Sequence, residues 1–205
     1  MKIITIGREY GSGGRTLGKL LAEKLNIPCY DKEVIREIAK LQGVSEERIR
    51  KITTTDIRGM YSATVGRSFS AQFMYDKKAM DVFSSQETVL KSLAEKGDCI
   101  IVGRSADIVL REYKPLNIFV YADKKTKLER CRERSNKELT DRQLIKKMKK
   151  IDRDRKVNRR VIADGDWGKK ENYHILVNTS GIEISSIVDG LAEFAKGWFK
   201  ENDQD

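Results

Sequence analysis

A glycine-rich stretch near the start of the chain has the composition of a loop that binds phosphate. Residues 7–16 read GREYGSGGRT and stand between an apolar run at 2–6 and a segment with helical leucine spacing. Gly7 ends the apolar run, and Gly11, Ser12, Gly13 and Gly14 form a cluster of small residues after it. Glycines let the backbone turn with positive φ and present N–H groups to an oxyanion, and a helix start favours the same anion. The pattern predicts an anion site in which Arg15 adds charge and the Thr16 hydroxyl binds Mg²⁺.

The stretch departs from the strict phosphate-binding motif G-x-x-x-x-G-K-[ST]. With Gly13 aligned on the second glycine, Arg8 stands at the first glycine, Gly14 at the lysine and Arg15 at the Ser/Thr. Only the order strand, glycine-rich loop, helix remains. The residues alone leave two interpretations open, a phosphate-binding loop and a structural turn between a strand and a helix.

Charged residues also follow two other predicted strands. Asp31 comes after the short apolar segment 28–30, and it is either the N-cap of the next helix or a group that accepts hydrogen bonds from a ligand. Arg104 emerges directly from the apolar run CIIV at 99–102, and Asp107 lies three residues further on. An arginine in this position either forms a structural ion pair or grips a phosphate, and Asp107 either orients it or contacts a nucleotide.

A basic segment follows later in the chain. Ten of the nineteen residues from 142 to 160 are lysine or arginine, and an inward apolar stripe at helical spacing leaves most of the lysines facing water. Arg155 comes where this stripe weakens, and together with Arg130 and Arg134 it is placed to close over a polyphosphate. No helix-turn-helix, zinc-finger or RNP-type signal accompanies the charge, so a nucleic-acid surface is not favoured.

Composition restricts the class of protein. The 205 residues carry a net charge of +10, which favours an anionic partner. The three cysteines, Cys29, Cys99 and Cys131, have no metal-type or disulfide-type spacing, which is typical of a reducing cytoplasm. We find no apolar run of the roughly 20 residues needed to span a bilayer and no signal peptide. We therefore expect a cytoplasmic protein with no membrane partner.

Apolar runs of the strand type alternate with helical patterns throughout the chain. Strands are expected at 2–6, 28–30, 99–102, 117–121 and 173–177. Helices are expected at 15–25, from 31 with Val34, Ile35, Ile38 and Leu41 inward, from a Ser45 N-cap, at 84–96, at 124–135, from a Thr140 N-cap and at 182–199. Residues 53–80 lack a clean period and are expected to be a mobile loop or short helices. The alternation predicts an α/β fold with a five-stranded parallel sheet covered by helices on both faces, which binds ligands at the carboxyl ends of its strands.

Taken together, these segments resemble the cytidylate kinase-like proteins, a branch of the P-loop nucleoside monophosphate kinase group. The resemblance covers nearly the whole length, and its most specific blocks are GREYGSGGR and VGRSAD. It implies a single three-layer P-loop kinase domain over 1–205, with an acceptor-binding insertion at 53–80 and a lid-like basic segment at 135–170.

The resemblance also implies the roles of the candidate site residues. Residues 11–16 would meet the phosphates of ATP or GTP with Mg²⁺. Asp31, Arg104 and Asp107 would hold a small acceptor such as a nucleoside monophosphate. Arg130, Arg134 and Arg155, with Arg15, would stabilise the transferred phosphate.

The lysine of true cytidylate kinases is absent, because Gly14 stands in its place. Either Arg15, or Arg8 folding back, replaces its charge, or the protein is a nucleotide-binding regulator with little or no kinase activity. Both alternatives stay open on the sequence.

Overall fold

The chain folds around one sheet of parallel strands in a computed structural model, which describes residues 1–53, 69–135, 139–162 and 166–202. The strands are β1 (Ile3–Arg8), β2 (Cys29–Tyr30), β3 (Cys99–Val102), β4 (Leu116–Tyr121) and β5 (Ile175–Asn178). Their order across the sheet is β2-β3-β1-β4-β5, and every pairing is parallel. The expected α/β fold is thus confirmed. β1 lies at the centre and delivers the glycine-rich loop to the middle of the carboxyl edge.

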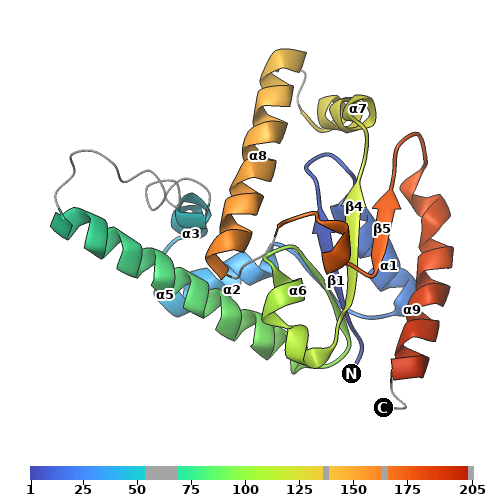
Figure 1. The fold of residues 1–205 in the computed structure, drawn as a ribbon, viewed down its shortest axis with the longest axis horizontal. Helices are drawn as coiled ribbons and strands as arrows, with labels where there is room; N and C mark the ends of the chain where they lie inside the picture. Colours follow the sequence, from blue (N-terminus) through green and yellow to red (C-terminus); the bar gives the residue numbers. More distant parts are fainter. Residues whose placement is uncertain (54–68, 136–138, 163–165, 203–205) are drawn as a thin grey trace.

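Helices cover both faces of the sheet (Figure 1). On one face, α1 (Gly14–Leu25) and α9 (Val188–Asn202) pack their apolar sides against β1 and β4. On the other face lie α2 (Glu33–Gln42), α3 (Glu46–Lys51), α5 (Phe69–Ala94) and α6 (Ala106–Val109). Two apolar clusters result, one on each face, and they hold the strand ends in fixed positions.

Two further helices, α7 (Lys124–Arg134) and α8 (Asp141–Ile162), stand at the carboxyl edge. Their contact is a small apolar cluster in which Cys131 of α7 meets Leu144 and Met148 of α8, with Tyr10 of the loop packed against it. α8 forms most of the segment expected to be lid-like, and it is packed directly on the glycine-rich loop in this structure.

Local signals placed several helix starts correctly. Ser45 accepts a hydrogen bond from the backbone N–H of Arg48, and this confirms the expected N-cap of α3. Thr140 and Gln143 exchange backbone-to-side-chain hydrogen bonds at the start of α8, which is the reciprocal pattern of a capping box. At both helix starts the capping hydrogen bonds join residues that are three positions apart, so the signal is local in the sequence.

Other expectations were wrong in detail. α5 begins at Phe69 rather than at residue 84, so the end of the segment expected to be irregular is helical. Residues 54–68 of that segment lie outside the described residues. The last helix begins at Val188 after a short 3₁₀ turn at Ile184–Ile187, and β5 runs from Ile175 to Asn178.

Candidate functional site

The loop between β1 and α1 has the backbone of an anion nest. Gly11 and Gly13 adopt positive φ angles of 84° and 83°, and Gly13 is the N-cap of α1 without any side-chain cap. The backbone N–H groups of Gly14, Arg15 and Thr16 therefore have no acceptor among the described residues. Orphan N–H groups at a helix start are a ready site for a phosphate.

Arg130 of α7 fixes the shape of this loop. Its guanidinium donates four hydrogen bonds, to the carbonyl oxygens of Ser12, Thr179 and Ile182 and to the Thr179 hydroxyl. The Thr179 hydroxyl in turn donates to the Ser12 carbonyl at 2.7 Å. Arg130 was expected to act on the transferred phosphate, but its donors are engaged by the protein and it lies outside the cavity described below. Arg130 therefore ties the glycine-rich loop to the segment after β5, and we call this set of hydrogen bonds the clamp on the loop.

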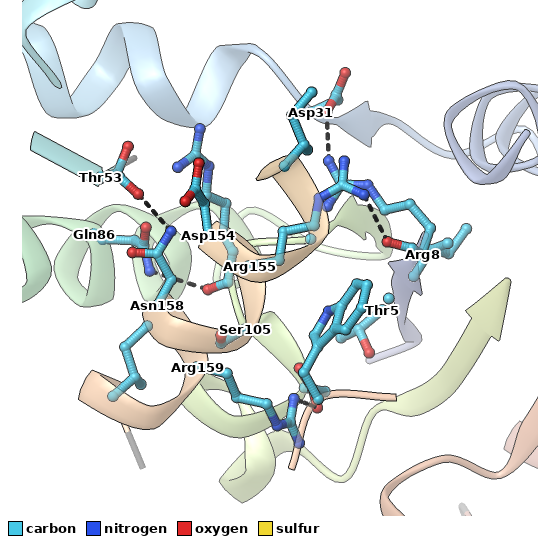
Figure 2. Close-up of a pocket in the computed structure, with 18 of the residues that line it drawn as sticks. Thr5, Arg8, Asp31, Thr53, Gln86, Ser105, Asp154, Arg155, Asn158 and Arg159 are labelled. Atoms are coloured by element: carbon cyan, nitrogen blue, oxygen red, sulfur yellow. Dashed lines mark hydrogen bonds and ion pairs between the residues drawn. The ribbon is translucent and has the colours of Figure 1, made fainter. Parts of the chain in front are cut away.

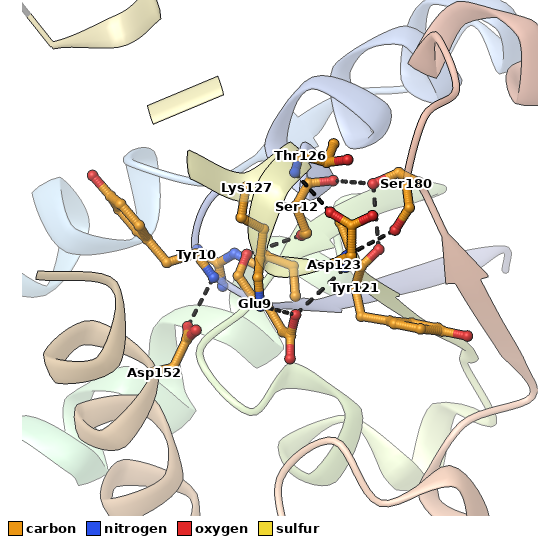
Figure 3. Close-up of polar contacts among 12 residues, drawn as sticks. Glu9, Tyr10, Ser12, Tyr121, Asp123, Thr126, Lys127, Asp152 and Ser180 are labelled. Atoms are coloured by element: carbon orange, nitrogen blue, oxygen red, sulfur yellow. Dashed lines mark hydrogen bonds and ion pairs between the residues drawn. The ribbon is translucent and has the colours of Figure 1, made fainter. Parts of the chain in front are cut away.

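The outer side of the loop is held by charged groups of α7 and α8, as Figure 3 shows. Lys127 forms an ion pair with Glu9 at 2.7 Å, and the Asp152 carboxylate accepts the Tyr10 backbone N–H at 2.8 Å. Burial raises the pKa of Asp152, against the opposing effect of Arg155. Arg134, on the exposed end of α7, donates to the Thr16 hydroxyl at 3.2 Å. Both helices therefore contact the loop through polar groups.

A cavity of about 350 Å³ opens beside the loop at the carboxyl ends of β1, β2 and β3. α8 forms one wall, and Thr53, together with Gln86 of α5, lines the cavity beside Asn158 of α8 (Figure 2). Its volume suits a small metabolite. The arginines that line it are Arg8, Arg15, Arg50, Arg104, Arg155 and Arg159.

Asp31 is an ion-pair partner in this cavity. Its carboxylate contacts Nε of Arg15 and lies 3.6 Å from the Arg8 guanidinium. Lys32, with no side-chain capping bond, is the N-cap of α2 instead. Of the two alternatives for Asp31, the N-cap is therefore wrong, because the fold brings two arginines of the loop region to its carboxylate.

Arg104 occupies a turn with unusual backbone geometry. Gly103, Arg104 and Ser105 have consecutive positive φ angles of 82°, 63° and 52°. Side-chain-bearing residues in this region are strained, and such strain is commonly found at ligand sites. Gln86 donates to the Arg104 carbonyl at 3.0 Å and so supports the turn. Arg104, at the centre of this turn, lines the cavity.

Within the described ranges no carboxylate lies at ion-pair distance from Arg104. Burial, followed by the neighbouring Arg50, lowers the pKa of Arg104 to about 10. A desolvated cation with like-charged neighbours is stabilised by an anionic ligand.

Asp107 pairs with Arg159 of α8 rather than with Arg104. Arg159 donates to the carboxylate at 2.5 Å, and its guanidinium also lies over the Tyr173 ring, 5.8 Å from the centroid. Burial raises the pKa of Asp107, while Arg159 favours its charged form. Of the two alternatives for Asp107, the orientation of Arg104 is therefore wrong, since α8 supplies the partner of the carboxylate.

Aromatic side chains form part of the cavity lining. Phe119 of β4 contacts the edge of the Trp167 ring at a centroid distance of 5.2 Å and the Tyr173 ring at 4.8 Å. Trp167 and Tyr173 both line the cavity. Both residues present aromatic surface to the site.

The fold thus gathers Arg15, Asp31, Arg104, Asp107 and Arg155 around one cavity and leaves Arg130 and Arg134 on the far side of the loop. Gln86 and Asn158 also line the cavity and were missed, because an amide in a helical pattern carries no sequence signal. Asn158 donates to the Thr53 carbonyl at 2.6 Å, and its own side-chain oxygen is buried without a partner in the described part of the chain.

Neither a metal centre nor a membrane span is found in the described parts of the chain. Its His, Cys, Asp and Glu side chains form no group of three or more that could hold a metal ion. None of its helices combines the length and the apolar character that crossing a membrane requires.

Comparison with known proteins agrees with this architecture. A family model described as the cytidylate kinase-like family matches residues 3–181. The structure of an uncharacterized protein from Eubacterium ventriosum is 28% identical, covers 96% of this chain and 99% of its own, and superposes with a TM-score of 0.69. A shikimate kinase from Bacteroides thetaiotaomicron is 14% identical, with coverage of 95% and 98% and a TM-score of 0.57, and so shares the fold. Among curated proteins, none matches the chain.

Proposed function

The chain belongs to the cytidylate kinase-like family, and from this premise we propose that it transfers a phosphate from ATP or GTP to a small anionic acceptor such as a nucleoside monophosphate. Family membership supports a nucleotide kinase in general terms. The observation that carries the finer proposal is the cavity beside the loop, which Arg104 lines without a carboxylate partner among the described residues. An acceptor that brings its own phosphate supplies the missing negative charge.

The donor side is the glycine-rich loop. The N–H groups at the start of α1, with residues 11–16, would hold the donor phosphates. The acidic side chains of the described residues offer no metal cluster, and Mg²⁺ commonly binds through nucleotide phosphates and a few protein oxygens. The Thr16 hydroxyl is the ligand that the chain offers for it. Bound with the nucleotide, Mg²⁺ would neutralise phosphate charge.

The acceptor side is the cavity. Arg104 would bind the acceptor phosphate through two parallel hydrogen bonds, and Asp31 would accept from a hydroxyl or amino group of the acceptor. Asp107 would act through Arg159, which it holds in place. The aromatic lining formed by Trp167 and Tyr173 suits the flat face of a ring.

In the reaction, an acceptor oxygen attacks the γ-phosphorus and the bond from that phosphorus to the β–γ bridging oxygen breaks. The electron pair leaves with ADP or GDP. The phosphate of a monophosphate acceptor is largely deprotonated at neutral pH, since its second pKa is about 6. No general base is then needed. Arg15 and Arg155 would stabilise the charge on the equatorial oxygens.

Two observations favour a second candidate, a nucleotide-binding regulator with little kinase activity. Gly14 stands where kinases of this type carry lysine, and the Asp152 carboxylate already accepts an N–H group of the loop. A protein of this kind binds nucleotide without turning it over.

The test is release of ADP from MgATP with a panel of nucleoside monophosphates and small unphosphorylated alcohols. We expect turnover with a monophosphate and a raised acceptor KM in Arg104→Ala. Arg111→Ala is the matched control, because this arginine lies in the 3₁₀ turn after α6 and does not line the cavity. MgATP binding by calorimetry without turnover for any acceptor favours the regulator. A preference for an alcohol over every monophosphate contradicts the acceptor class.

A further inference from the structure

Arg8 and Gly14 occupy the same space. A Cβ atom added at Gly14 would lie 2.6 Å from Cβ of Arg8 and 3.1 Å from its Cγ. Real Cβ atoms essentially never approach backbone-proximal carbons this closely, so a side chain at position 14 requires Arg8 to move. The lysine of the phosphate-binding motif would begin at this atom. The stem of Arg8 therefore fills the volume through which that lysine would leave the helix.

The far end of Arg8 passes a second glycine. A Cβ atom at Gly103 would overlap Nη1 of the Arg8 guanidinium. Gly103 has a φ of 82° and opens the strained turn that carries Arg104. The Arg8 side chain thus crosses from the glycine-rich loop to the end of β3 over two positions without a Cβ, and its guanidinium reaches the cavity.

The guanidinium lies where the donor loop and the cavity meet. It is 3.6 Å from Asp31, and its side chain is 16% exposed. Arg155 donates to the Arg8 carbonyl at 2.9 Å and so fixes the backbone at this point (Figure 2). Burial, and next the charge of Arg155, lowers the pKa of Arg8, while Asp31 opposes the shift.

We propose that Arg8 is the catalytic cation of the loop, replacing the lysine of the usual motif and contacting the phosphoryl group as it moves from donor to acceptor. This inference rests on the proposed function. A guanidinium that enters from the end of β1 replaces an ammonium that would enter from the start of α1. Two of its N–H groups can meet two equatorial oxygens at once, whereas an ammonium acts as a point charge. Arg8 forms and breaks no covalent bond.

Arg15, the other candidate for this role, is placed less well. Its side chain is 49% exposed, and its Nε contacts Asp31. The Arg8 side chain is less exposed. It lies so close to positions 14 and 103 that a Cβ at either one would collide with it, which explains why both are glycine. Arg15, whose Nε is held by Asp31, is accordingly the weaker candidate for replacing the lysine.

The first experiment tests whether the side chains at positions 8 and 14 compete for the same space. Gly14→Ala and Gly14→Lys should both lower the midpoint of thermal unfolding, because each adds the Cβ. The midpoint of Arg8→Ala/Gly14→Ala should stay low, since the Cβ of residue 8 remains. The midpoint of Arg8→Gly/Gly14→Ala should return toward that of the wild type, because this Cβ is gone. Recovery in both double variants, or in neither, overturns the steric relationship.

The second experiment measures affinity for two probes by calorimetry, MgADP and the magnesium complex of an ATP analogue whose β–γ bridge is NH. Arg8→Ala should weaken binding of the analogue about tenfold or more and leave MgADP within about twofold. Arg8→Gly/Gly14→Lys should regain affinity for the analogue, and its matched control Arg8→Gly/Gly14→Ala should not. Equal loss for both probes assigns Arg8 a structural role and overturns the proposal.

Turnover separates this inference from the proposed function. If wild-type protein turns over, Arg8→Ala should lower kcat about 100-fold or more, and Arg15→Ala should lower it less. The reverse order overturns the assignment. If wild-type protein does not turn over, the proposed kinase activity fails, while the contrast between the analogue and MgADP still decides whether Arg8 contacts the γ-phosphate.

Discussion

Arg159 of α8 donates to the Asp107 carboxylate of α6 at 2.5 Å, with side chains only 4% and 9% exposed. The pair joins the helix that forms one wall of the cavity to the helix that follows the strained turn of Arg104. A charge pair this deeply buried contributes modestly to stability while both partners are present, because desolvation offsets their attraction. Its main effect is to fix α8 relative to the end of β3.

Removing one partner of this pair should be strongly destabilising. Arg159→Ala leaves a buried carboxylate without its cation, and we expect a loss of about 3–5 kcal/mol in the free energy of unfolding in urea. The matched control is Arg132→Ala, because the pair of Arg132 with Asp141 is half-exposed and should contribute little to stability. Asp107→Leu/Arg159→Met should recover most of the loss. Equal effects of Arg159→Ala and Arg132→Ala would show that the buried pair does not hold the helices together.

The strained turn should respond to glycine. Ser105 has a φ of 52°, and Lys114, outside the cavity, has a φ of 47°. Glycine adopts this region without strain, so Ser105→Gly and Lys114→Gly should each raise the free energy of unfolding by about 0.5–1 kcal/mol.

The two variants should differ in activity. Ser105→Gly loosens the backbone next to Arg104, and the acceptor KM should rise, whereas Lys114→Gly should leave this KM unchanged. Steady-state kinetics alongside urea unfolding measures both effects. An unchanged KM in Ser105→Gly would mean that the strained backbone does not position Arg104.

The fold was largely predictable because its signals are local. Each strand is a short apolar run, and Ser45 and Thr140 mark helix starts within one turn. The start of α5 at Phe69 was not predictable, since the residues before it lack a clean apolar period. The strand order was also beyond a local pattern, because it depends on how the crossover helices pack.

The site was predictable as a set of charged groups but not as a set of pairs. The positions of Asp31, Arg104 and Asp107 after strands placed them at the correct edge of the sheet. Their partners come from elsewhere in the chain: Arg15 for Asp31, and Arg159, which is 52 residues away, for Asp107. The sequence gives the sign of each charge, whereas the packing of α8 and α1 decides which charges meet.

The only histidine of the chain should make stability depend on pH. His174 accepts the Asn117 backbone N–H on Nδ1 at 2.9 Å, and its ring lies 4.3 Å from that of Trp198. Burial lowers the pKa of His174 below its ordinary value of 6.5. Between the folded and unfolded pKa values the unfolded state binds more protons, so this contribution is complete above about pH 6.5 and is lost as the pH falls.

The measurement compares wild-type protein with His174→Gln in urea at several pH values, so that groups common to both cancel. Stability of the wild type should fall relative to the variant as the pH drops below about 6.5. The Cε1 proton of the single histidine gives its pKa directly by NMR. A folded-state value at or above 6.5 contradicts the prediction.

Arg130 and Arg134, both expected to stabilise the transferred phosphate, should separate into two roles. Arg130→Ala removes the donors of four hydrogen bonds around the loop, and we expect a loss of about 2–3 kcal/mol in unfolding free energy together with weaker MgATP binding. Arg134 is exposed and donates one hydrogen bond of 3.2 Å to the Thr16 hydroxyl, so Arg134→Ala should change stability by less than about 0.5 kcal/mol.

Urea unfolding and MgATP calorimetry on the same samples distinguish these roles. Arg130→Lys tests the geometry of the clamp, because one ammonium cannot reach acceptors on both Ser12 and Ile182 as a planar guanidinium does, so most of the stability loss should persist. If Arg130→Ala instead keeps full stability and nucleotide affinity while kcat falls, Arg130 acts on the phosphate in transfer. The loop would then owe its shape to Thr179 and Ser12 alone.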